Sequence, residues 1–222
     1  HHTIPLEKEY RAYILDYFRR EYMAGRTPNP CVRCNRTMKF GFLLSKAHAL
    51  GIAFDRFATG HYARVEPDPV TGRFLLKKGL DAGKDQSYFL THLTQDQLRQ
   101  VLFPLGNLTK AQVRDKACEL GLTDVADQPE SQDFLGCGSY APLFNGMAVK
   151  PGPILDRQGN VLGQHRGIVH YTIGQRHGLG IGGQVEPLHV IGIDVARNAV
   201  VVGLREDLMA KALTAVDVNW IA

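Results

Sequence analysis

The spacing of apolar residues changes along the chain, and this change constrains the fold more than any other feature. At the start, apolar residues recur at every fourth position, which predicts an amphipathic helix carrying Leu6, Tyr10, Ile14, Phe18 and Tyr22. Thr3 is expected to cap this helix and Gly25 to end it. After Pro151, short apolar runs alternate with turn residues, which is typical of β-hairpins. The sequence therefore predicts an α/β part followed by an all-β part, with a boundary near Lys150.

A proline-stiffened segment follows the first predicted helix. Because Pro28 and Pro30 disfavour helix, we expect a rigid loop around them and a second helix over residues 35–50. Cys31 and Cys34 lie in this loop. Their Cys-x-x-Cys spacing lets two sulfurs share a metal ion, or lets one thiol stabilise the other as a thiolate.

Positive charge surrounds this cysteine pair. Arg26, Arg33 and Arg36 lie within a few residues of it and are expected to favour the thiolate form. A third cysteine, Cys137, stands between two glycines in a predicted loop and is expected to be accessible. A zinc site is disfavoured because no fourth ligand is obvious. The cysteines therefore either share a chemical role or are unrelated thiols.

A short apolar run over residues 54–58 predicts a strand that ends in Thr59, Gly60 and His61. Ligands gather at the carboxyl ends of strands in open α/β sheets, so this tip is a candidate site. Gly60 would let a ligand approach the backbone, and His61 could bind a phosphate or a base. A plain turn is the alternative.

A polar triplet, Lys84, Asp85 and Gln86, precedes an apolar run. These residues could bind a polyanion or could merely cap the following element. The triplet alone does not decide between the two.

Two further helices carry matching start signals. Thr94 and Gln97, and again Thr109 and Gln112, fit a capping box. In the second of these helices, Cys118 lies next to the apolar face and is expected to be a buried, inert thiol.

Composition narrows the class of protein. Apolar residues make up 44% of the 222, which excludes a disordered or fibrous chain. The net charge of +4 arises in residues 1–40, which hold eight Lys or Arg and four acids. Such a basic patch fits nucleic acid, or is a solvated helix face. No apolar run predicts a membrane span or signal peptide, so we expect a cytoplasmic protein without a membrane partner.

Taken in order, several motifs resemble those of the tRNA-specific 2-thiouridylase family (MnmA or TrmU). They occupy residues 25–35, 58–62, 84–90, 130–133, 163–167 and 172–180, and the resemblance covers essentially the whole chain. It implies ATP-dependent sulfur transfer to C2 of the wobble uridine (position 34) of tRNA. The implied route adenylates the C2 oxygen and delivers sulfur from a cysteine persulfide.

The resemblance also implies roles for particular residues. The two catalytic cysteines would be Cys34 and, with the persulfide, Cys137. Gly60 would contact ATP, which is bound with Mg²⁺. Residues facing the target base or the tRNA would be Asn29, Pro30, Cys31, His61, Lys84, Asp85 and Gln86. A sulfur-relay protein or a cysteine desulfurase would supply the persulfide.

The chain departs from the family pattern in ways that keep alternatives open. It lacks a Ser-Gly-Gly-Val-Asp-Ser loop, so a missing N-terminal PP-loop segment is expected, as is a shortened C-terminal β-barrel. The family's second cysteine position is Leu135, and Cys137 follows two residues later. This chain alone would then be inactive, and a non-catalytic tRNA-binding fragment is one alternative. Another is a [4Fe–4S] enzyme with the ligands Cys31, Cys34 and Cys137.

The fold class implied by the resemblance is α/β. We expect the remainder of an adenine-nucleotide-hydrolase-like (PP-loop) parallel-sheet domain over residues 1–148. A small central tRNA-contacting β domain would occupy residues 149–183. The start of the C-terminal β-barrel would occupy residues 184–222.

Overall fold

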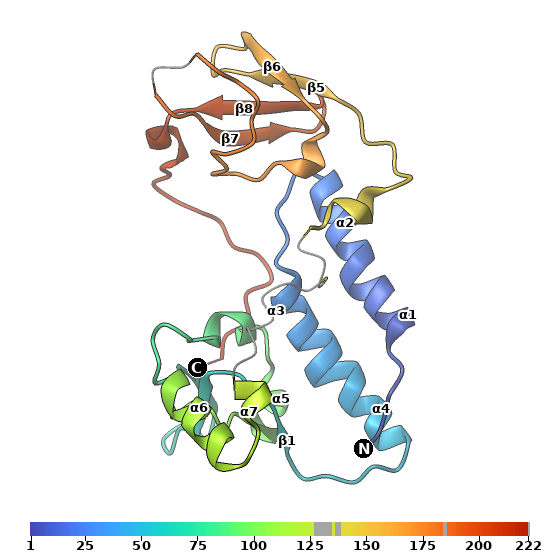
Figure 1. The fold of residues 1–222 in the computed structure, drawn as a ribbon, viewed down its shortest axis with the longest axis vertical. Helices are drawn as coiled ribbons and strands as arrows, with labels where there is room; N and C mark the ends of the chain where they lie inside the picture. Colours follow the sequence, from blue (N-terminus) through green and yellow to red (C-terminus); the bar gives the residue numbers. More distant parts are fainter. Residues whose placement is uncertain (127–134, 136–138, 184–185, 222) are drawn as a thin grey trace. The chain divides into compact units, whose positions relative to one another are not determined.

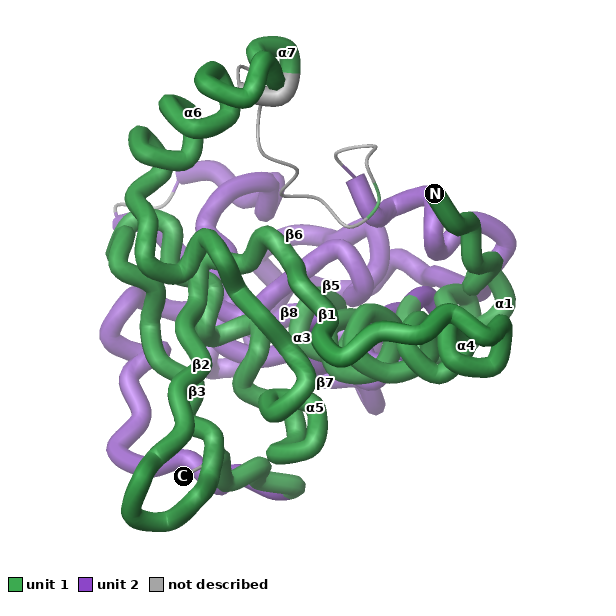
Figure 2. The backbone as a smooth tube through the Cα atoms, turned by 90° about the horizontal axis from the view of Figure 1, so that it is seen from below, with its two compact units in different colours: residues 1–14, 30–136, 217–222 green, residues 15–29, 137–216 purple. Residues whose placement is uncertain are grey.

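The fold was analysed in a computed structural model that describes residues 1–126, 135, 139–183 and 186–221 (Figure 1). The chain divides into two compact units, coloured separately in Figure 2. The first comprises residues 1–14, 30–136 and 217–222, and the second comprises residues 15–29 and 137–216. Within the described parts of the chain, no helix has the length and apolar character needed to cross a membrane.

The first predicted helix is present. It consists of α1 (Glu7–Tyr10), a π-helical segment (Arg11–Leu15) and α2 (Asp16–Met23). The apolar positions Ile14, Phe18 and Tyr22 are buried, and Gly25 follows the helix with a φ of +69°. The predicted cap at Thr3 is wrong, because the helix begins at Glu7 and its N-cap residue, Leu6, makes no side-chain hydrogen bond.

The second helix begins earlier than predicted. It consists of α3 (Pro30–Cys34), a π-helical segment (Asn35–Phe42) and α4 (Leu43–Ala49). The predicted rigid loop is therefore wrong for residues 30–34. Proline is compatible with the first turn of a helix because the N–H that it lacks has no partner there.

The described residues of the first unit form two small sheets. β1 (Phe57–Ala58) pairs in parallel with β4 (Val101–Leu102). β2 (Ala63–Pro67) and β3 (Phe74–Lys78) pair as an antiparallel hairpin. A 3₁₀ turn follows over Ser87–Leu90. A core shared by these elements and the second helix contains Phe40, Ala63, Leu90, Leu93, Leu98 and Val101.

Both capping boxes are confirmed. Thr94 caps α5 (Gln95–Gln100) and Thr109 caps α6 (Lys110–Glu119), each with the reciprocal glutamine hydrogen bond. A short helix α7 (Thr123–Ala126) follows. The expectation of a buried Cys118 is wrong, because this residue is exposed and α6 has no buried residue.

The second unit contains the β part that the sequence predicts. The four strands in the described residues of this unit lie in the order β6-β5-β8-β7 (Figure 1). Their bounds are Gly152–Leu155 (β5), Val161–His165 (β6), His189–Asp194 (β7) and Ala199–Gly203 (β8). Short 3₁₀ turns span Ala141–Phe144, Ile168–His170 and Arg205–Leu208. Rings of α2 and the first of these turns form an aromatic cluster of Phe18, Tyr22, Tyr140 and Phe144.

Candidate functional site

A cavity of about 670 Å³ lies within the first unit. Three segments contribute most of its wall: the second helix, the turn after β1 and the loop after β3. Its described lining residues are Cys31, Asn35, Lys39, Gly60, His61, Tyr62, Gly83, Lys84, Asp85, Gln86, Phe89, Leu105, Lys110 and Val113. The volume suits a small molecule or a single base rather than a folded partner.

The helix wall presents Cys31, Asn35 and Lys39 to the cavity. These residues are spaced by four, so they lie on one helix face. They reach the cavity together because the helix already includes Pro30. The segment Asn35–Phe42 is π-helical, a form often found at functional sites.

Cys34 is half-buried and is not among the residues that line the cavity. Burial raises the pKa of the Cys34 thiol. The ammonium group of Lys39 opposes this shift, and Cys31 adds to it. The expectation that Arg26, Arg33 and Arg36 favour the thiolate of Cys34 is therefore wrong, because desolvation outweighs the opposing charge, which comes from Lys39.

Part of the predicted basic patch is neutralised locally. The Nη1 of Arg19 lies 2.8 Å from a carboxylate oxygen of Asp16, and the Nε of Arg26 lies 2.6 Å from one of Glu21. These arginines therefore behave in part as the solvated helix face that the sequence left open as the alternative.

The turn after β1 places Gly60 and His61 in the cavity wall. His61 is only 9% exposed, and its ring packs against those of Phe40 and Phe103, at centroid distances of 6.0 and 5.8 Å. Burial, with a smaller contribution from Lys39, lowers the pKa of His61 to about 4. The imidazole is thus neutral near pH 7, and it would contact a base or phosphate through hydrogen bonds rather than through charge.

His61 is also held by a neighbour in its own turn. The Oγ1 of Thr59 lies 2.6 Å from Nδ1 of His61. This contact fixes the ring and commits Nδ1, which leaves Nε2 as the ring nitrogen for other partners.

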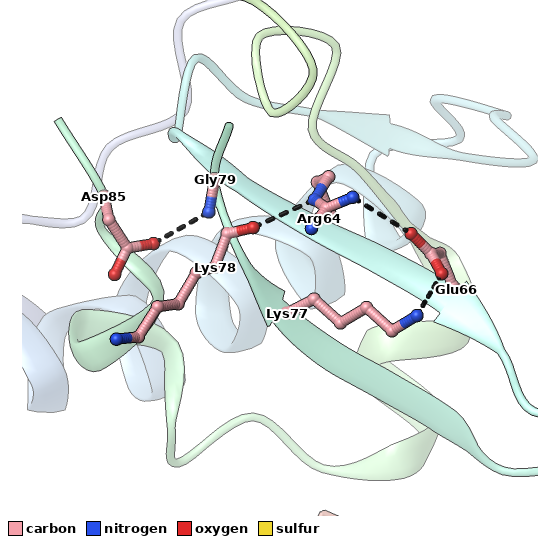
Figure 3. Close-up of polar contacts among 6 residues, drawn as sticks. All are labelled: Arg64, Glu66, Lys77, Lys78, Gly79 and Asp85. Atoms are coloured by element: carbon pink, nitrogen blue, oxygen red, sulfur yellow. Dashed lines mark hydrogen bonds and ion pairs between the residues drawn. The ribbon is translucent and has the colours of Figure 1, made fainter. Parts of the chain in front are cut away.

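The side chain of Asp85 is committed to the loop after β3. One of its oxygens accepts from the backbone N–H of Gly79 at 2.8 Å (Figure 3), and the other accepts from the hydroxyl of Ser87 at 2.8 Å. Burial acts to raise the pKa of Asp85, but hydrogen bonds from Gly79 and Ser87 outweigh it, and the pKa is lowered. Asp85 is thus an ionised carboxylate that shapes the loop.

The hairpin beside this loop is held by charged side chains. Arg64 donates from Nε to the carbonyl oxygen of Lys78 at 2.9 Å, and its guanidinium lies 3.6 Å from Glu66 (Figure 3). Lys77 forms an ion pair with the same glutamate. These contacts fix the strand that precedes Gly79.

The side chain of Gln86 is also held by a hydrogen bond, in this case with Tyr62. The backbone N–H of Tyr62 donates to Oε1 of Gln86 at 3.0 Å.

The lining of the cavity also includes three lysines, Lys39, Lys84 and Lys110, so among the described residues its charge is mainly positive. Such a lining favours an anionic ligand.

The structure brings most of the predicted site residues together. Those in the cavity wall are Cys31, Gly60, His61, Lys84, Asp85 and Gln86. Asn29 and Pro30 stand at the start of the second helix without lining the cavity, and Cys137 lies outside the described residues.

Sequence reasoning left several lining residues out of the predicted site. Asn35 and Lys39 follow Cys31 at helical spacing, a signal that only a helix beginning at Pro30 makes visible. Lys110 is the first residue of a helix whose capping box is plain in the sequence. Nothing in the sequence indicated that this helix start would reach the cavity.

Comparison with known proteins identifies two family models. The model described as the tRNA methyl transferase HUP domain matches residues 1–137. The model described as the tRNA methyl transferase PRC-barrel domain matches residues 143–204. These matches confirm the predicted fold class, a PP-loop-like α/β domain followed by a β domain.

Similar proteins are named for one activity. The chain is 48% identical over 227 residues to "tRNA-specific 2-thiouridylase MnmA" of Heliobacterium modesticaldum, covering 100% of the chain and 58% of that protein. It is 53% identical over 213 residues to the protein of the same name from Moorella thermoacetica, covering 94% of the chain and 58% of that protein. The chain thus spans about three fifths of the length of these relatives. From the family models and these identities together, we conclude that the chain belongs to the family of tRNA-specific 2-thiouridylases.

Proposed function

We propose that the complete protein carrying this chain is a tRNA 2-thiouridylase that transfers sulfur to C2 of the wobble uridine, position 34. The observation that carries this proposal is a Cys-x-x-Cys pair on the first turn of a helix that walls a lysine-lined cavity. The names of the similar proteins point the same way. The matched family models are described by methyl transfer, but a Cys-x-x-Cys pair in the helix that walls the cavity favours sulfur chemistry.

The chemistry requires an activated oxygen. The C2 carbonyl of uridine is a poor electrophile, so its oxygen would attack the α-phosphate of ATP, bound with Mg²⁺, and release pyrophosphate. AMP then becomes the leaving group at C2. Gly60 would contact ATP, and the lysines Lys39, Lys84 and Lys110 would favour the phosphates of ATP or tRNA.

Sulfur would then arrive as a persulfide on Cys137, supplied by a sulfur-relay protein or a cysteine desulfurase. The terminal persulfide sulfur attacks C2 and displaces AMP. The thiolate of Cys34 attacks the inner sulfur, which forms a Cys34–Cys137 disulfide and frees the thiocarbonyl. A cellular dithiol reduces this disulfide before the next cycle.

Contacts to the tRNA would come from both sides of the cavity. Asn29, Pro30 and Cys31 would face the target base, and His61 and Lys84 would contact the tRNA directly. Asp85 and Gln86 would act by holding the loop that presents Lys84, because their side chains bind Gly79 and Tyr62.

A [4Fe–4S] cluster with Cys31, Cys34 and Cys137 as ligands would replace the persulfide as the sulfur carrier. The described residues supply two of these cysteines, and they contain no group of three His, Cys, Asp or Glu that could hold a metal ion. A cluster would thus depend on Cys137, and no step of the proposed reaction passes through one. A non-catalytic tRNA-binding protein is the other alternative.

The test uses cysteine variants of the complete protein. Cys34→Ser and Cys137→Ser should each abolish 2-thiouridine, measured by mass spectrometry of the tRNA product, and should leave tRNA affinity within about twofold. Cys118→Ser is the matched control, because Cys118 is an exposed cysteine of α6 outside the cavity wall. Normal thiolation by Cys34→Ser would contradict the assignment. Iron and sulfide analysis after anaerobic purification separates the persulfide route from the cluster.

A further inference from the structure

Asn35 is a buried amide in the wall of the cavity. The residue is 3% exposed, and its Nδ2 donates to the carbonyl oxygen of Phe89 at 3.0 Å. Its Oδ1 is closed to solvent and has no hydrogen-bond partner among the residues that the structure describes. A buried acceptor without a donor is unfavourable, and such groups in native proteins call for a functional explanation.

The helix places Asn35 between Cys31, which carries a thiol, and Lys39, which carries an ammonium group. Asn35 lies one helical turn after Cys31 and one turn before Lys39, and all three line the cavity. The bond to Phe89 fixes the amide, so Oδ1 cannot turn away to solvent without losing that bond. Because Oδ1 is closed to bulk water, a donor on a bound ligand reaches it only if the atoms that cover it shift as the ligand enters the cavity.

We propose that Asn35 is the residue that distinguishes uracil from cytosine, with Oδ1 accepting a hydrogen bond from N3–H of the target base. This inference rests on the proposed function. Uracil carries a hydrogen on N3, whereas cytosine presents a lone pair there, so only uracil satisfies the acceptor. N3 is bonded directly to C2, so this contact would also set C2 beside the helical turn that carries Cys31.

The energetic argument follows from the unpaired acceptor. A site that is built to bond one polar group rejects an analogue that lacks it, because the site's own buried group then stays unpaired. Cytosine would place the lone pair of its N3 against Oδ1 of Asn35, so that two acceptors would face each other. A preference of about tenfold or more for uridine is expected from one such hydrogen bond.

The test measures tRNA binding in the absence of ATP, so that no sulfur transfer follows binding. Two tRNA transcripts that differ only in U or C at the wobble position are titrated with the complete protein. Three variants are compared: Asn35→Leu removes the acceptor, Asn35→Asp keeps it, and Thr37→Val is a control. Thr37 lies on the same helix and donates to the carbonyl oxygen of Arg33, outside the cavity wall.

The expected result is a loss of discrimination confined to one variant. The wild type, Asn35→Asp and Thr37→Val should bind the U transcript about tenfold more tightly than the C transcript. Asn35→Leu should bind both with the affinity that the wild type shows for the C transcript. Circular dichroism confirms that each variant is folded. If the Leu variant does not fold, a transcript with 3-methyluridine at the wobble position, which lacks the N3–H, is titrated with the wild type: it should bind no more tightly than the C transcript, and binding equal to that of the U transcript would overturn the inference.

Several outcomes would overturn the inference. Asn35→Leu could weaken the binding of both transcripts equally, or Asn35→Asp could lose the preference for the U transcript as fully as Asn35→Leu does. Either result would mean that Asn35 acts only through its bond to Phe89. If the wild type binds neither transcript, the proposed function itself fails. A wild type that discriminates while Asn35→Leu discriminates equally well refutes only the role of Asn35.

Discussion

Gln86 and Tyr62 hold each other through two hydrogen bonds of opposite direction. The backbone N–H of Gln86 donates to the carbonyl oxygen of Tyr62 at 2.9 Å, and the backbone N–H of Tyr62 donates to Oε1 of Gln86 at 3.0 Å. Both residues line the cavity. This pair therefore joins the loop after β3 to the turn after β1 and fixes two walls of the candidate site.

Gln86→Ala should destabilise the protein by about 1–3 kcal/mol, because it leaves the N–H of the buried Tyr62 without an acceptor. Gln86→Glu keeps an acceptor oxygen, so it should lower the free energy of unfolding by clearly less than Gln86→Ala does. The free energy of unfolding, measured with urea, separates the two variants. Equal losses would show that Oε1 of Gln86 does not bind Tyr62 in solution.

Gly60→Ala should leave stability unchanged within about 0.5 kcal/mol and weaken ATP binding. A Cβ at Gly60 would meet only Leu105, at an ordinary contact distance of 3.6 Å, so the methyl group projects at the cavity wall without a clash. Gly106→Ala is the contrasting variant, since its Cβ would overlap the carbonyl oxygen of Ala63. Thermal unfolding and nucleotide titration are the measurements, and undiminished ATP affinity in Gly60→Ala would remove Gly60 from the nucleotide site.

His61 should make the protein less stable in mild acid. Its pKa in the folded state is about 4, below the value of about 6.5 expected after unfolding. As the pH falls from 6.5 to 4, the unfolded state takes up a proton that the folded state excludes. Stability is therefore full above pH 6.5 and decreases toward pH 4, by up to about 3 kcal/mol.

His61→Gln should flatten this pH dependence, measured as the free energy of unfolding at pH 7.5 and pH 5. His92→Gln is the matched control because His92 is exposed. An unchanged slope in His61→Gln would mean that His61 titrates as a solvated imidazole.

Lys84→Ala should weaken tRNA binding and reduce its salt dependence. Lys84 lines the cavity, and the loss of one phosphate contact should lower the slope of log affinity against log salt by about one. Titration of tRNA at several salt concentrations gives the slope. A slope equal to that of the wild type would exclude Lys84 from the phosphate-binding surface.

Asn219→Ala should loosen the last residues of the first unit. Its Nδ2 donates to the carbonyl oxygens of Thr91 and Leu93, each at 2.9 Å, so the loss of both bonds should cost about 1–2 kcal/mol. Trp220→Ala is the control, because this side chain is 77% exposed and only its backbone carbonyl accepts from Arg73. Equal stability of the two variants would contradict a structural role for Asn219.

Local chemistry explains what could be predicted from the sequence. Thr94 and Thr109 cap their helices because a hydroxyl three residues before a glutamine satisfies the first backbone N–H groups wherever the helix packs. The hairpins after Pro151 followed from turn residues between apolar runs for the same reason. Gly60, His61 and the triplet starting at Lys84 could be named because their motifs match the family.

The errors arose where one residue has two compatible conformations. Pro30 disfavours a helix interior but fits a helix start, and only the packed chain selected the second. This choice moved Cys31 from a loop onto a helix face.

The error at Cys118 had another cause. The modest apolar face of α6 does not show whether another element covers it.

The sequence by itself determined the order of helices and hairpins, the cysteine spacing and the family, since these depend on neighbours along the chain. The tertiary structure alone decided that Asn35 and Lys39 share a cavity with Gly60 and Lys84. It also decided that His61 is neutral, because the rings that desolvate it come from distant segments. Burial and proximity are properties of the packed chain, and they set the charge and the unmet hydrogen bonds through which a site acts.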